Sequence, residues 1–75
     1  MQENYHVKWN FPLRLKEAME DNMATPLDFE DAGICAESSI KSYLRGKNIP
    51  NLRTAQAIAE YLGVSLDYLC GDGEK

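Results

Sequence analysis

The sequence predicts an all-α fold of five short helices. Turn signals divide the chain of 75 residues into short segments, and within these segments apolar residues recur at the spacing of three and four that an amphipathic helix requires. Most of the segments also begin at a capping residue or end at a glycine. Short helices joined by tight turns favour an orthogonal array around a single core over a long bundle.

The first helix is predicted to begin at a cap that is followed by proline. Asn10 is a suitable capping residue, and Pro12 falls in the first turn, where a backbone N–H has no helical partner to lose. Apolar side chains share one face of the segment that continues to residue 23, and Asn22 extends this face. The apolar members are Leu15, Ala18 and Met19.

The second helix has the stronger start signal. Thr25 can cap it, Pro26 occupies the first helical position, and Asp28 lies three residues after the cap, as in a capping box. We expect about two turns, with Phe29 facing inward and the helix ending near residues 32–33.

The third helix is predicted over residues 36–45. It stops at Gly46, because glycine readily adopts the left-handed backbone found after a helix C-terminus. Its inward face contains Ile40 together with Tyr43 or Leu44.

Polar caps and glycines also bound the last two helices. Asn51 precedes a fourth helix that ends at Gly63, and Ser65 precedes a final short helix over residues 66–69 that ends at Gly71. The fourth helix has apolar residues at helical spacing along its whole length: Leu52, Ala55, Ile58, Ala59 and Leu62.

Composition indicates a single globular domain with one modest core, since the hydrophobic fraction is 44%. No apolar run approaches the ~20 residues that span a bilayer, and the polar start is unlike a signal peptide. We therefore expect a cytoplasmic protein without membrane contact. We also expect no small-molecule ligand, because so small a core leaves little room for a pocket.

The sequence contains no catalytic or metal-binding signature. Cys35 and Cys70 form no Cys-x-x-Cys pair, and the single His6 is distant from both along the chain, so no zinc ligand set emerges. We expect two reduced, partly buried thiols instead. Because nucleophile–base sets and glycine-rich phosphate loops are also missing from the sequence, we predict that the protein is not an enzyme and has no metal or cofactor.

Charge is distributed unevenly along the chain. The net charge is −4, but residues 35–56 carry four basic side chains and one acidic side chain. Residues 14–34, in contrast, carry two basic and six acidic side chains. An acidic body with one basic segment predicts a local basic face.

The chain is expected to divide into three parts: an N-terminal arm (1–10), a folded domain (11–71) and a polar tail (72–75). In the arm, Tyr5, Val7 and Trp9 alternate with polar residues, which is the period of a strand. Two interpretations stay open. The segment forms a short strand that pairs within the chain or with a second copy, or it is an arm whose aromatic residues cover the core.

Four stretches of the sequence carry a family resemblance: Arg14–Asp21 (RLKEAMED), Ser39–Leu52 (SIKSYLRGKNIPNL), Ala55–Leu69 (AQAIAEYLGVSLDYL) and Cys70–Asp72. Through them, residues 14–73 resemble, without a gap, the helix-turn-helix DNA-binding domain of phage repressors and Cro-like (XRE-type) bacterial regulators. The resemblance implies a lambda-repressor-like fold in which the second and third helices form the helix-turn-helix. It also implies that the third helix lies in the major groove of double-stranded DNA.

The resemblance also implies two groups of DNA-contacting residues around the buried anchor Ile40. Base edges would be contacted by Glu37, Ser38, Lys41 and Ser42. Phosphates would be contacted by Arg45, Gly46, Lys47, Asn48 and Arg53. The alternative interpretation is an ordinary solvated helix face, on which Glu37 and Lys41 form a favourable i,i+4 pair.

Five positions depart from the family pattern. Pro26 stands where a phosphate-binding glutamine is usual, and Glu30 stands where a small residue lets the two helices pack closely. Gly33 lies one place before the usual turn glycine, which predicts a rearranged turn. Ala36 replaces the usual capping serine, and Met23 replaces a glycine that commonly ends the first helix.

Two functions follow from these observations. The leading hypothesis is a repressor-like, sequence-specific DNA-binding transcriptional regulator of phage, mobile-element or bacterial origin. It would act as a homodimer whose candidate contact is Tyr5, Val7 and Trp9. The alternative is a protein-interaction module that keeps the helix-turn-helix fold and has lost DNA binding, which the acidic net charge, Pro26 and Glu30 favour.

Overall fold

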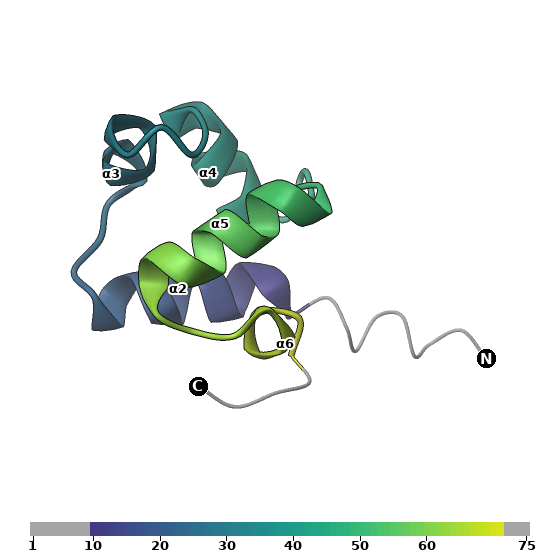
Figure 1. Cartoon of the computed structure of the whole chain (residues 1–75). Helices are drawn as coiled ribbons and strands as arrows, with labels where there is room; N and C mark the ends of the chain where they lie inside the picture. Colours follow the sequence, from purple (N-terminus) through teal and green to yellow (C-terminus); the bar gives the residue numbers. More distant parts are fainter. Residues whose placement is uncertain (1–9, 72–75) are drawn as a thin grey trace.

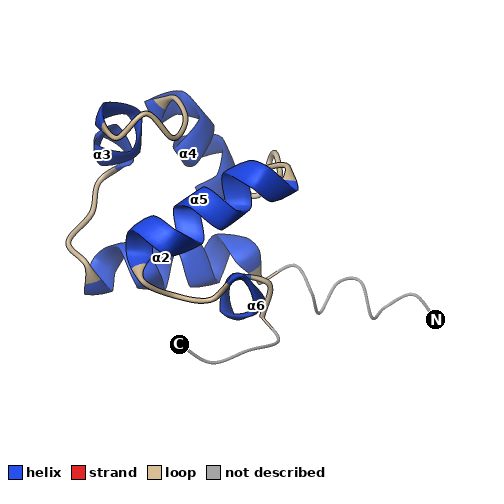
Figure 2. Ribbon diagram, viewed as in Figure 1, coloured by secondary structure: helices blue, strands red, loops and turns tan. Residues whose placement is uncertain are grey.

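The structure is a computed structural model that describes residues 10–71. Tyr5, Val7, Trp9 and the predicted polar tail therefore lie outside the described residues. Five helices follow one another in this range (Figure 1): α2 (Phe11–Asp21), α3 (Pro26–Asp31), α4 (Glu37–Leu44), α5 (Leu52–Leu62) and α6 (Leu66–Leu69). Figure 2 shows only helices and loops over the same residues. The prediction of an all-α fold with five short helices is confirmed.

The helices form an orthogonal array rather than a bundle. In Figure 1, α3 and α4 lie together at the top, α5 crosses in front of α2, and α6 lies below them. The closest helix pairs are α3 with α4, α2 with α4, α2 with α6, and α5 with α6. The pair α3–α4 is the predicted helix-turn-helix, and α2 supports α4 from below.

One shared core holds these helices together. Each helix contributes one large side chain that is fully buried: Leu15, Phe29, Ile40, Ile58 and Leu69. Phe11 packs edge-on against Tyr43 with 6.2 Å between the ring centroids, so the ring of Tyr43 covers this core from α4. The predicted inward face of the third helix is confirmed, and both Tyr43 and Leu44 are partly buried beside Ile40.

The connection between α2 and α3 depends on two residues with different roles. Met23 is 88% exposed and has a φ of 55°, a left-handed backbone that costs a non-glycine residue about 1 kcal/mol. Asn22 stabilises the same connection, since its Nδ2 donates to the carbonyl oxygens of Ala18 at 2.8 Å and of Leu62 at 3.0 Å. Leu62 O belongs to the last turn of α5, where carbonyls have no helical partner. Asn22 therefore joins the C-terminal ends of α2 and α5.

Cap geometry agrees with the sequence for most helix starts. Asn51 Oδ1 accepts from Thr54 N–H at 2.8 Å, and Ser65 Oγ accepts from Tyr68 N–H at 2.9 Å. Asn10 occupies the cap position of α2, but its side chain makes no capping hydrogen bond. None of the helices within residues 10–71 has the length and apolar character needed to cross a membrane.

Replacing Asn22 by alanine is expected to lower the free energy of unfolding by about 1–2 kcal/mol, because it leaves the Leu62 carbonyl without its donor. Urea unfolding followed by circular dichroism would measure this change. The matched control is Asn10→Ala, which removes the same amide from a position without a capping bond and should change stability by less than about 0.5 kcal/mol. Equal losses in the two variants would contradict the link between α2 and α5.

Candidate nucleic-acid interface

The first helix of the pair, α3, is short and firmly anchored. Its start is stabilised by Asp28, whose Oδ2 accepts from Thr25 N–H at 2.8 Å, as the sequence predicts. Pro26 occupies the first helical position. Phe29 is fully buried and lies 5.1 Å, centroid to centroid, from the ring of Tyr61 on α5. The backbone of α3 is therefore held to the core at its centre.

The turn between α3 and α4 is built around Gly33. This glycine has a φ of 78°, and its N–H donates to Glu30 O at 3.0 Å while Ile34 N–H donates to Phe29 O at 2.9 Å. This pair of bonds is a Schellman termination of α3. Gly33 therefore supplies the left-handed residue of the turn, although it lies one position before the turn glycine that is usual in the family. Ile34 and Cys35, which follow it, pack partly against the core.

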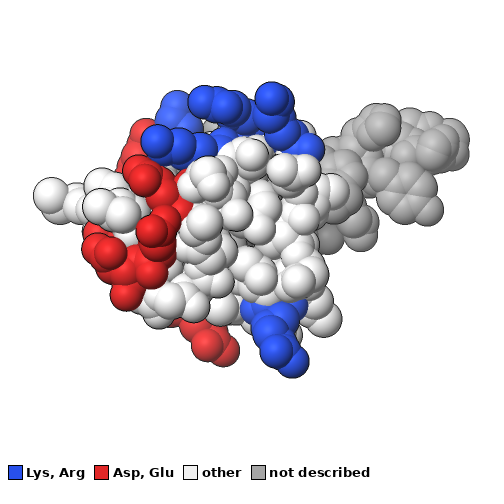
Figure 3. Space-filling model, turned by 90° about the horizontal axis from the view of Figure 1, so that it is seen from above, with Lys and Arg blue, Asp and Glu red and all other residues white. Residues whose placement is uncertain are grey.

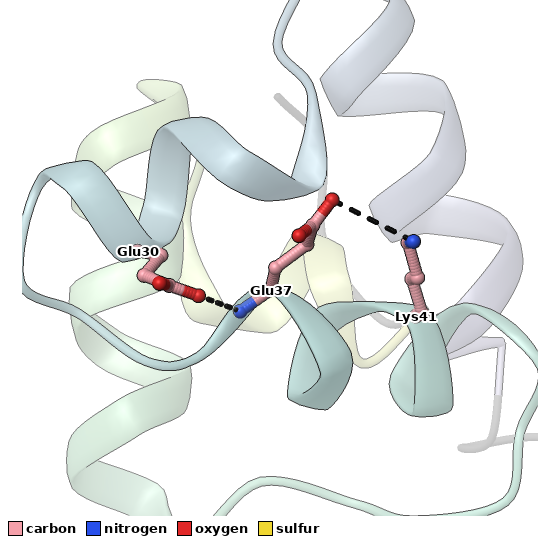
Figure 4. Close-up of polar contacts among 3 residues, drawn as sticks. All are labelled: Glu30, Glu37 and Lys41. Atoms are coloured by element: carbon pink, nitrogen blue, oxygen red, sulfur yellow. Dashed lines mark hydrogen bonds and ion pairs between the residues drawn. The ribbon is translucent and has the colours of Figure 1, made fainter.

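The start of α4 lacks a cap of its own. Ala36 precedes the helix and has no side-chain acceptor. Glu30 provides one from α3, because its Oε1 accepts from Glu37 N–H at 2.8 Å (Figure 4). Glu30 thus supplies an acceptor at a helix start where Ala36 has none, and α3 and α4 still pack against each other.

The four base-contacting candidates lie on α4 around the fully buried Ile40. Ser38 and Lys41 are exposed, whereas Glu37 and Ser42 are partly exposed. Glu37 Oε2 lies 3.5 Å from Lys41 Nζ, so the predicted i,i+4 ion pair forms, although surface pairs of this kind contribute only ~0.2–1 kcal/mol. An open polar groove of about 560 Å³ brings Ser38 and Ser42 together with residues beyond the helix, namely Asn48, Pro50 and Asn51.

Four of the five phosphate-contacting candidates lie at the end of α4. Arg45, Gly46, Lys47 and Asn48 are all exposed. Gly46 has a φ of 75°, and its N–H donates to Tyr43 O while Lys47 N–H donates to Ser42 O, both at 3.0 Å. Because these two amides already close the helix, Gly46 shapes the turn, and the side chains that follow it remain exposed. Arg53 is exposed in the first turn of α5.

Charge is divided across the face that carries α3 and α4. Figure 3 shows Lys and Arg gathered along one edge of this face, over α4 and the loop after it, and Asp and Glu gathered beside them on the side of α3. A smaller blue group lies apart on the opposite edge. The basic segment of the sequence therefore does form a local basic face, and it has an acidic neighbour.

Arg14 is engaged in a contact that the sequence does not reveal. Its guanidinium carbon lies 4.6 Å from the ring centroid of Tyr68, and Tyr68 Oη donates to Glu17 Oε1 at 3.2 Å. These contacts tie α2 to α6 over a separation of more than 50 residues. A cation held on an aromatic face in this way stabilises the fold, and no spacing rule in the sequence identifies its partner.

Cys35 and Cys70 are both reduced thiols and partly buried, as the sequence predicts. Burial raises the pKa of the Cys35 thiol, so this side chain is protonated at neutral pH. Within residues 10–71 no group of three His, Cys, Asp or Glu side chains could hold a metal ion. His6 lies outside the described residues.

Comparison with family models identifies the class of protein. The model of the Helix-turn-helix family matches residues 15–69, which is well over half of the chain. The chain therefore belongs to the Cro-like (XRE-type) helix-turn-helix family of DNA-binding regulators, and its fold is the lambda-repressor-like all-α fold. Comparison with curated proteins gave no match, and comparison with solved structures gave none either.

Lys47→Glu is expected to weaken binding to all duplexes alike, roughly tenfold, and to reduce the slope of log K against log salt by about one, since a phosphate contact carries no sequence information. Lys16→Glu is the matched control, because it makes the same charge change on the exposed surface of α2. Ser38→Ala should instead change preference among duplex sequences. Fluorescence anisotropy across a salt series measures these effects. Equal losses from Lys47→Glu and Lys16→Glu would show that only net charge matters.

Proposed function

We propose that this protein is a sequence-specific DNA-binding transcriptional regulator of the repressor type, of phage, mobile-element or bacterial origin, with α4 in the major groove of DNA. The observation that carries the proposal is the position of the basic side chains. They lie beside the exposed polar face of α4 in a chain that belongs to a family of DNA-binding regulators. A cytoplasmic location follows from this proposal, because that is where such a regulator meets its DNA.

Each side chain on α4 suits a particular part of the duplex. Glu37 can accept a hydrogen bond from cytosine N4, and Lys41 can donate to guanine O6 and N7. Ser38 and Ser42 can donate to or accept from several base edges. All four lie within the eight residues of α4, so they face one short stretch of the groove.

The phosphate contacts fall to the residues at the end of the reading helix. Arg45 and Lys47 supply positive charge, and Asn48 supplies an amide. Gly46 contributes the turn that presents these neighbours, because its own N–H closes α4. Arg53, at the start of α5, is an additional phosphate candidate.

The negative net charge is compatible with this proposal because the charges are segregated. Figure 3 shows most acidic side chains gathered beside the basic edge, with Glu37 paired to Lys41 at their boundary, and a domain polarised in this way is oriented as it approaches a polyanion. Glu30, which the sequence analysis counted in favour of the interaction module, has its Oε1 directed at the start of α4. The interaction-module alternative keeps two supports, the acidic surface and Pro26, which has no N–H to donate to phosphate.

Selection from random duplexes at low salt, followed by anisotropy titration up to physiological salt, tests the proposal. We expect enrichment of a short palindrome and affinity that falls steeply with salt, since counterion release dominates such binding. The half-sites should lie about one helical turn, ~34 Å, apart. Absence of binding even at low salt would favour the protein-interaction module instead.

The same proposal includes a homodimer, because a palindromic site is contacted by a two-fold symmetric protein. The candidate contact is the alternating segment Tyr5, Val7 and Trp9, which lies outside the described residues. A strand-like segment with one apolar face needs a partner, and a second copy of the chain supplies one.

Simultaneous substitution of Tyr5, Val7 and Trp9 by serine is expected to convert a dimer into a monomer in sedimentation velocity, because it removes the apolar face of the arm. Leu13→Ser is the control, since it removes an apolar side chain that is 53% exposed on α2. In the parent chain Trp9 is the only tryptophan, so its emission maximum should move to shorter wavelength as concentration rises and the dimer forms. A dimer that persists in the triple variant would exclude the arm as the contact.

A further inference from the structure

The hydrogen bond between Glu30 and Glu37 joins the two halves of the helix-turn-helix across the turn (Figure 4). We propose that Glu30 is a positioning residue for DNA recognition: it holds the first turn of α4 against α3 and thereby sets how Glu37 and Ser38 face the bases. This inference rests on the proposed function, and it adds to it a determinant of specificity that does not itself contact DNA.

The start of α4 needs an acceptor that its own cap position does not provide. The first backbone N–H groups of a helix have no intrahelical partner, and the N-terminus carries partial positive charge. Ala36 at the cap position has no polar side chain. The Glu30 carboxylate meets both needs at once, since it accepts from Glu37 N–H at 2.8 Å and brings negative charge to the positive end of the helix dipole.

The acceptor comes from a residue whose own backbone is fixed. Glu30 follows Phe29, which is fully buried and packs on Tyr61, and its carbonyl accepts from Gly33 N–H in the turn. A cap built on this anchored residue transmits the position of α3 to α4. A local cap at position 36 would instead accept from an N–H further along the first turn, that of Ser38 or Ser39, and would stabilise the helix start without linking it to α3.

The start of α4 is held on its N-terminal side by Ile34 and Cys35, which pack partly against the core, and by the solvent-exposed bond to Glu30. Glu37 and Ser38 are not buried, and the only fully buried side chain of the helix is Ile40, one turn further on. The opposite end of α4 is held by the bonds around Gly46. The helix is thus anchored at its middle and its end, and the Glu30 bond is the contact that links its first turn directly to a side chain of α3.

The bond also separates the roles of the two carboxylates. In Figure 4 the backbone N–H of Glu37 is directed at Glu30, whereas the Glu37 carboxylate is directed at Lys41, 3.5 Å away. Because Glu30 occupies the helix N-terminus, the Glu37 side chain stays on the outer face of α4 with Lys41. That face is the one that the proposed function directs at the bases.

The test compares the parent chain with Glu30→Ala, Ala36→Ser and the double variant. Thermal unfolding and hydrogen exchange of the Glu37 amide report the bond itself. The ratio of affinities for the selected duplex and for mixed-sequence duplex reports positioning. In Glu30→Ala we expect faster exchange at Glu37 and a lower Tm. We also expect about tenfold weaker binding to the selected duplex, the effect of one lost base contact, with little change for mixed-sequence duplex.

The double variant separates positioning from simple capping. Ala36→Ser supplies a local cap, so it should restore the Tm of Glu30→Ala and leave the affinity ratio reduced. Recovery of the ratio together with the Tm would overturn the proposal, because Glu30 would then act only as a cap. Glu30→Gln keeps an acceptor oxygen and should retain most of the parent ratio.

Two further outcomes would also overturn the proposal. Tighter binding of Glu30→Ala to both duplexes would mean that the carboxylate acts only as a charge near DNA. The control Asp31→Ala, which removes the same charge from the same exposed helix, should leave the ratio and the Glu37 exchange rate unchanged. A parent chain that binds no duplex would overturn the proposed function and DNA positioning with it, whereas Glu37 exchange would still show whether the bond exists.

Discussion

None of these helices is long enough to be stable alone, so every one depends on the small core that they share. The longest have 11 residues and the shortest has four, below the ~12–15 residues at which an isolated helix becomes even marginally stable in water. Each helix therefore contributes one large, fully buried side chain to that core. Full burial of such a side chain stabilises by about 1.5–3 kcal/mol, which offsets part of the conformational entropy lost when the segment that carries it is ordered.

Dependence on a shared core also explains how the helices of the candidate interface keep fixed positions although their outer side chains are exposed. Ile40 anchors α4 at its middle, Phe29 anchors α3, and the turns at Gly33 and Gly46 fix where each helix stops. These inner contacts therefore fix the positions of the polar side chains on the outside of α4. A surface of short serine and glutamate side chains needs such a support, because base contacts depend on the position of the helix as a whole.

Two of the departures from the family pattern, Glu30 and Ala36, are linked rather than independent. Glu30 and Ala36 look like two separate losses when each is considered alone, but the carboxylate of one replaces the missing cap beside the other. At the end of α2, the strained left-handed backbone of Met23 stands next to Asn22, whose side chain bonds to two helix carbonyls. In both places a rule that is broken locally is offset by a hydrogen bond that crosses to another helix.

The sequence by itself determined the number of helices, their order and most of their inward residues, because caps, terminating glycines and helical spacing act within a few residues of one another. Leu52 has the predicted spacing but is 64% exposed, and the burial of Phe11 and Tyr68 was not predicted. It also determined that positive charge would gather around α4, since four of the basic residues are close together along the chain. Only the tertiary structure decided the partners of Glu30, Asn22 and Arg14. Their contacts join different helices, and Asn22 reaches 40 residues along the chain. Such pairings depend on how the helices pack around the common core, and no local pattern of residues encodes that geometry.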